Sequence, residues 1–189
     1  WASPIGNWPY AIYWQHTGET IDNQLYRPYR SMELGGAEVW GDLDSGASWR
    51  LNFEWADTLC SGTVDEQKLW DCAYNNGIFT DGYRYYDQVM GHSMDGDGTM
   101  YSARFIRIDG AANTLTVLAR YTKVNEALVE PDTLHSVAAG AEDWISLDVS
   151  YRYGLRSGWV EGGVGVDSQD RKWQGDEAAL PRAYVSWNY

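Results

Sequence analysis

Apolar and polar residues alternate strictly between positions 49 and 57. Large apolar side chains occupy the odd positions, which are Trp49, Leu51, Phe53 and Trp55, and the positions between them are polar or small. A period of two predicts a β-strand with two chemically different faces. In a soluble sandwich the apolar face would pack on a protein core. In an outer-membrane barrel it would meet lipid, and the polar face would line the interior.

The same alternation recurs along the chain and predicts an antiparallel meander of about nine strands. We expect them at residues 10–16, 31–40, 49–57, 83–90, 100–108, 114–123, 143–153, 159–166 and 183–189. Long polar loops are expected at 58–82, 125–142 and 167–180. Gly35 and Gly36 inside the second strand predict a bulge or a close approach of neighbouring groups. No helical periodicity, repeat or linker is found, so residues 1–189 are interpreted as one all-β domain.

Composition favours partly wet surfaces over a dry core. The chain has 11 Trp and 14 Tyr but 3 Phe, and Trp and Tyr gather at membrane interfaces and sugar sites. A net charge of -13 argues against nucleic acid as a partner. No run of about 18 apolar residues is present, which excludes a helical membrane span. The chain begins at Trp1 without a signal-peptide pattern, so we expect a processed, trimmed or partial chain.

Cys60 and Cys72 bracket a polar loop, and two cysteines so placed in an exported protein predict a disulfide. Two unpaired thiols are the alternative. The three histidines lie at 16, 92 and 135, without the spacing of a zinc site. The Asp-Gly-Asp-Gly sequence at 95–98 lacks the further acidic ligands of a calcium loop and predicts a tight turn. Neither a metal nor a cofactor is expected.

The strand pattern favours a barrel over a sandwich. The strands are long enough to cross a bilayer when tilted. Aromatic residues flank their ends, and the chain ends on Tyr189 after an alternating strand, which resembles the C-terminal assembly signal of outer-membrane proteins. An odd strand number conflicts with the even number in bacterial barrels. Either a further strand lies within 58–82, or the chain is part of a larger barrel.

Three stretches together resemble the Wzi-type capsule-assembly outer-membrane proteins. They are the Asn-Phe-Glu-Trp-Ala-Asp-Thr sequence at 52–58, the sequence from Tyr74 to Tyr85 with its Asn-Asn-Gly and Thr-Asp-Gly-Tyr-Arg-Tyr groups, and Gly-His-Ser-Met-Asp-Gly-Asp at 91–97. The resemblance is strong over residues 50–108. It implies an outer-membrane barrel of about 18 strands, of which this chain is the C-terminal half. It also implies a non-enzymatic lectin that holds capsular or other surface polysaccharide, with outer-membrane lipid around it.

Sugar binding requires aromatic rings that stack on pyranose rings, and carboxylates or amides that bind hydroxyl groups. Aromatic and amide residues in the predicted loops meet this requirement, and the candidates are Tyr26, Tyr29, Trp70, Tyr74, Asn75, Asn76 and Trp173. Packing within the loops is the alternative role for each. The alternative for the whole chain is a secreted β-sandwich that acts as a carbohydrate-binding module or glycosidase. Glu54 and Asp57 are carboxylates near each other in sequence, but no catalytic motif surrounds them.

Overall fold

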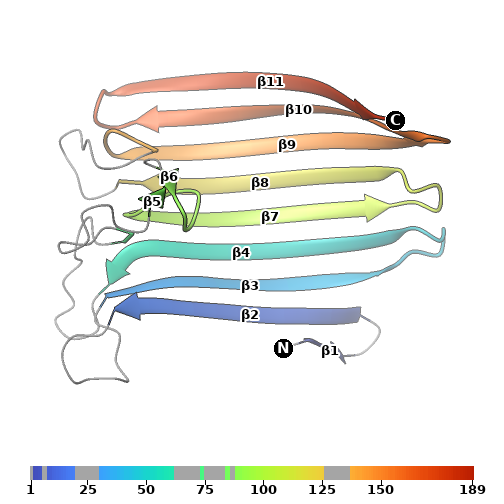
Figure 1. The fold of residues 1–189 in the computed structure, drawn as a ribbon, viewed down its shortest axis with the longest axis horizontal. Helices are drawn as coiled ribbons and strands as arrows, with labels where there is room; N and C mark the ends of the chain where they lie inside the picture. The colour runs from blue at the N-terminus through green and yellow to red at the C-terminus, as the bar shows by residue number, and fades with distance from the viewer. Residues whose placement is uncertain are drawn as a thin grey trace.

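The computed structural model describes residues 2–5, 8–19, 30–61, 73–74, 84–85, 88–125 and 137–189. Its main element is an antiparallel sheet of nine strands (Figure 1), which run in the order β1-β2-β3-β4-β7-β8-β9-β10-β11. The strands are β1 (Ala2–Ile5), β2 (Trp8–Glu19), β3 (Arg30–Asp42), β4 (Ser48–Ser61), β7 (Gly98–Ile108), β8 (Thr114–Val124), β9 (Glu142–Leu155), β10 (Gly158–Arg171) and β11 (Asp176–Asn188). A separate hairpin joins β5 (Arg84–Tyr85) to β6 (Gln88–Val89).

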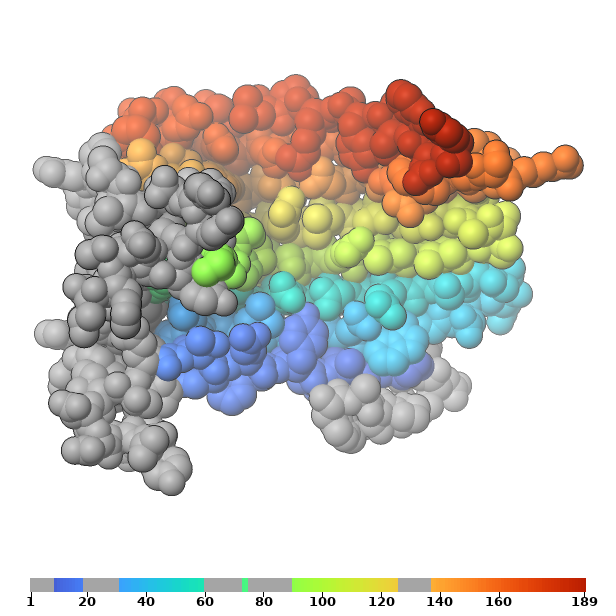
Figure 2. Space-filling view, in the orientation of Figure 1, coloured from blue at the N-terminus to red at the C-terminus, as the bar shows by residue number. Residues whose placement is uncertain are grey.

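The strands from β2 to β11 lie side by side across the sheet (Figure 2). In the strand order, β1 and β11 form its two edges. The predicted all-β antiparallel meander is therefore confirmed. The nine long and edge strands of the described residues form one sheet, whereas a β-sandwich consists of two sheets packed face to face. The same part of the chain contains no helix that is long and apolar enough to cross a membrane.

Two predicted elements are wrong. Residues 83–90 do not form a strand of the main sheet, since β4 pairs directly with β7 and residues 84–89 supply only the small β5–β6 hairpin. The predicted loop at 167–180 is mostly strand, because β10 continues to Arg171 and β11 begins at Asp176. The short edge strand β1 was missed in the sequence.

These corrections define the two ends of the sheet. With 83–90 outside the sheet, the connections that follow β2, β4, β8 and β10 all leave from one end, which we call the loop end (Figure 1). The short turns after β3, β7 and β9 lie at the opposite end, the turn end. A hidden strand in 58–82 is not required, and the odd number of strands agrees with a partial barrel.

One face of the sheet is apolar and exposed. We call it the outer face, and cross-strand register aligns its residues into rows. One central row joins Val39, Leu51, Phe105, Val117, Val149, Val164 and Ala183. Side chains along this face are open to the surroundings, for example Phe53 at 51% and Val164 at 62% exposure. An exposed apolar face of this extent suits contact with lipid and not with water.

An aromatic row marks where the apolar part of the outer face stops. It runs across five strands from Trp14 through Gly35, Trp55 and Tyr101 to Tyr121. The next row toward the loop end is polar on every long strand, and its members are His16, Glu33, Asp57, Thr99, Lys123, Asp143, Asp170 and Glu177. Aromatic rings beside a polar row are the pattern of a membrane–water interface.

The buried core is small and lies at the loop end. It consists of Ala56, Met94, Met100, Val124 and Ala138, with Leu34 and Trp144 packed against it. Leu34, Ala56, Met100 and Trp144 belong to one row of the face opposite to the outer face. Apart from Ala47 in the turn after β3 and Gly163 on β10, burial in the described residues is concentrated where connections fold over this second face. Most of the sheet is a single layer, as a barrel wall is.

Candidate functional site

The second face, which we call the inner face, carries charged side chains at the positions between the apolar ones. On β8 to β11, Asp148 accepts hydrogen bonds from the Arg182 guanidinium at 3.0 and 2.5 Å and lies 3.7 Å from Arg120. Arg182 also pairs with Asp167. Nearer the turn end, Arg152 donates to Glu161 at 2.7 Å. The sequence predicted polar inner-face residues, and the structure shows that on these strands they are joined in ion pairs.

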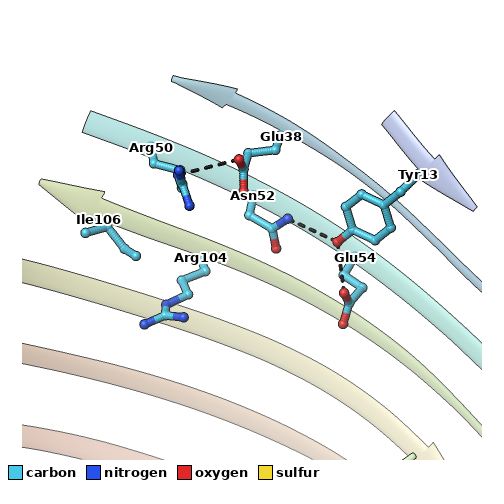
Figure 3. A pocket seen from close by; sticks show the side chains of 7 residues that line it. All are labelled: Tyr13, Glu38, Arg50, Asn52, Glu54, Arg104 and Ile106. Carbon is cyan, nitrogen blue, oxygen red and sulfur yellow. Dashed lines mark hydrogen bonds and ion pairs between the residues drawn. The ribbon is translucent and has the colours of Figure 1, made fainter. Parts of the chain in front are cut away.

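A depression on the inner face spans β2, β3, β4 and β7 and has a volume of about 230 Å³. Its lining is drawn in Figure 3 and consists of Tyr13, Glu38, Arg50, Asn52, Glu54, Arg104 and Ile106. We call it the lumen pocket. Alternation brings these residues together, because on each strand only every second side chain reaches the inner face.

Gly36 shapes the pocket. Tyr13, Gly36 and Glu54 are direct neighbours in one row across β2, β3 and β4. Since glycine has no side chain, the Tyr13 ring lies over β3, where a Cβ on Gly36 would overlap the ring. The predicted close approach is therefore confirmed at Gly36. The irregularity of β3 lies elsewhere, since the register between β3 and β4 shifts between Ser31 and Glu33.

Hydrogen bonds hold the Tyr13 ring over the pocket. Its hydroxyl donates to Glu54 Oε2 at 2.8 Å and accepts from Asn52 Nδ2 at 3.1 Å. On the other side, Arg50 Nε lies 3.5 Å from Glu38 Oε1. The pocket thus presents an aromatic ring, an amide, two carboxylates and two guanidinium groups on one wall (Figure 3).

At the loop end of the wall, a buried turn at 94–98 packs against the inner face and bonds to β4. The Thr58 hydroxyl donates to the Asp95 carbonyl at 2.8 Å and accepts from the Gly98 amide at 3.1 Å. Asp95 and Asp97 both have positive φ, which confirms the predicted tight turn. Nearby, burial lowers the pKa of His92. No group of three potential metal ligands exists in the described part of the chain.

The structure describes two of the predicted sugar-binding residues. Tyr74 packs on Gly91 and accepts a hydrogen bond from the His92 amide at 2.9 Å. Trp173, in the turn between β10 and β11, packs on Gly140 and donates to Glu142 at 3.1 Å. Tyr74 is thus held within the connection between β4 and β7, whereas Trp173 is held against the end of the connection between β8 and β9. Tyr26, Tyr29, Trp70, Asn75 and Asn76 lie outside the described residues. So does Cys72, and no side-chain placement is described for Cys60, so the disulfide stays a prediction.

The lumen pocket was not predicted from the sequence. The predicted sugar-binding residues lie in loops, whereas the pocket is built from alternate positions of four strands. The signal was present in two parts. Arg50, Asn52 and Glu54 were expected on the polar face, and Gly36 indicated a close approach. What was missing was the cross-strand register that places Tyr13 opposite Gly36.

Comparison with known proteins agrees with this architecture. The family model of the capsule assembly protein Wzi matches residues 1–178. The chain belongs to the Wzi family. This confirms the resemblance found at 50–108 and extends it over almost the whole chain.

A solved structure shows the same fold. It is described as Wzi, an outer-membrane protein involved in group 1 capsule assembly in Escherichia coli and a carbohydrate-binding β-barrel. The two structures superpose with a TM-score of 0.72 at 20% sequence identity, over 94% of this chain. This chain covers 38% of that protein. The fold of this chain is thus that of part of a β-barrel wall. Among curated proteins, none matched the chain.

Proposed function

We propose that this chain forms part of an outer-membrane barrel that binds capsular or other surface polysaccharide without altering it chemically. The lumen pocket is the observation that carries the proposal. It combines a Tyr ring with an amide and carboxylates, which are the groups that stack on a sugar ring and bind its hydroxyls. Wzi of Escherichia coli is described as carbohydrate-binding and supports the same function.

The position of the pocket also supports the proposal. It lies on the inner face, while the opposite face carries the exposed apolar residues suited to lipid. A polar ligand would therefore meet Tyr13, Asn52 and Glu54 from the water-filled side of the wall. The loop candidates, Tyr74 and Trp173 among them, remain predicted contacts for a longer stretch of polysaccharide at the loop end.

Tyr13→Ala tests the pocket. It removes the ring and its bonds to Asn52 and Glu54, so we expect the affinity for surface polysaccharide to fall about tenfold, the effect of losing roughly 1.4 kcal/mol. Tyr184→Ala is the matched control. Tyr184 also lies over a glycine, Gly163, and donates to a glutamate, Glu161 at 2.7 Å, but it does not line the pocket.

The measurement is calorimetric titration of the purified outer-membrane protein, in detergent, with polysaccharide extracted from the surface of the producing cells. Equal affinity of the two variants would contradict a role for the pocket. Absence of binding by the unmodified protein would overturn the proposed function. Reducing ends should not increase during prolonged incubation, and their release would indicate a glycosidase instead.

A further inference from the structure

Arg104 differs from the other arginines that face the lumen. Arg50, Arg120, Arg152, Arg171 and Arg182 have carboxylate oxygens at 3.5, 3.7, 2.7, 3.5 and 2.5 Å. Within the described ranges, Arg104 has no ion-pair partner. It nevertheless lines the lumen pocket beside Asn52, its direct neighbour on β4. A guanidinium without an ion-pair partner can donate two parallel hydrogen bonds to the carboxylate of a bound ligand.

The groups around Arg104 explain why no carboxylate of the pocket forms an ion pair with its guanidinium. Directly opposite it stand Asn52 on β4 and Leu118 on β8, and neither is acidic. Glu38 lies 3.5 Å from Arg50. Glu54 accepts a hydrogen bond from the Tyr13 hydroxyl at 2.8 Å. Figure 3 shows the Arg104 side chain directed away from the Glu54 carboxylate. The pocket thus has one end that attracts an anion and another that accepts hydrogen bonds.

We propose that the lumen pocket binds an acidic sugar unit, with Arg104 bonded to the sugar carboxylate. This inference rests on the proposed function and names the ligand class of the same site. Glu54 and Asn52 bind hydroxyl groups of the same unit, and the Tyr13 ring packs on its apolar side. Arg104 thereby distinguishes uronic acids from the corresponding neutral hexoses, because only the uronic acid supplies a partner for the guanidinium.

The test compares surface polysaccharide before and after chemical reduction of its carboxyl groups to primary alcohols. The purified outer-membrane protein in detergent should bind the reduced polymer about tenfold more weakly than the native one, as loss of one charge-assisted bond of about 1.4 kcal/mol implies. Competition with D-glucuronate should displace the native polymer at lower concentration than competition with D-glucose.

Arg104→Gln should weaken binding of the native polymer about tenfold and leave binding of the reduced polymer unchanged. Arg107→Gln is the control, since it removes the same charge from the outer face of the same strand. Equal affinity for native and reduced polymer, or an equal loss of both in Arg104→Gln, would overturn the acidic-sugar assignment and leave polysaccharide binding standing. Failure of both polymers to bind the unmodified protein would overturn the proposed function itself.

Discussion

Leu147→Arg is expected to destabilise the folded protein by about 2–4 kcal/mol, the cost of a cationic side chain at the lipid-facing midplane of a barrel. Leu147 lies in a central row of the outer face, between Ala119 on β8 and Val166 on β10, and is 46% exposed. If this face meets lipid, the arginine must either enter hydrocarbon or distort the bilayer around it.

Ser146→Arg is the matched control for Leu147→Arg. Ser146 is the preceding residue of β9, but it faces the lumen between Arg120 and Asp167. An arginine there gains a carboxylate neighbour and remains on the polar side, so a change within about 1 kcal/mol is expected. The free energy of unfolding in lipid vesicles, measured by denaturant titration, compares the two variants. Similar losses for both would argue against lipid contact on the outer face.

Gly158→Ala is expected to cost about 2 kcal/mol or more. Gly158 begins β10 directly after the turn from β9 and has φ of +146°, a conformation open mainly to glycine. An added Cβ would also overlap the backbone carbonyl oxygen of Asn188 on β11, which cannot move without breaking the strand pair. Strain and steric overlap therefore act together at this position.

Gly110→Ala serves as the control for Gly158→Ala, since Gly110 lies in the turn between β7 and β8. A Cβ at Gly110 would meet no atom within 4 Å, and its φ is not in the left-handed region. We expect a change within about 0.5 kcal/mol, as at an ordinary surface position. The midpoint of denaturant unfolding distinguishes the two variants. A Gly158→Ala protein as stable as the parent would show that the turn end can rearrange without cost.

The sequence predicted the two-faced strands well because their signal is local. In the segment at 49–57, the period of two alone separates the apolar residues from Arg50, Asn52 and Glu54, and the structure places these sets on opposite faces. The Wzi resemblance came from the same region. The register between neighbouring strands depends on residues far apart in the sequence. The lumen pocket, which depends on that register, could therefore not be predicted.

The two wrong elements have different physical causes. The polar residues 167–171 predict a loop, but the strand continues past the aromatic row, where the outer face becomes polar. Polarity there marks the end of the apolar part of the outer face and not the end of the strand. Residues 83–90 are rich in Tyr and have strand propensity, but β7 occupies the place beside β4. Pairing across a long connection overrides local preference.

Oxygen accessibility along β9 tests most directly whether the outer face meets lipid. Single cysteines replace Ser146, Leu147, Val149 and Ser150, each carries a nitroxide label, and the parent protein treated identically provides the blank. In lipid bilayers, molecular oxygen, which partitions into hydrocarbon, should relax the labels at 147 and 149 most strongly. A water-soluble nickel complex should prefer the labels at 146 and 150. Equal accessibility at all four positions, or the reverse alternation, would contradict a barrel wall with lipid on its apolar face.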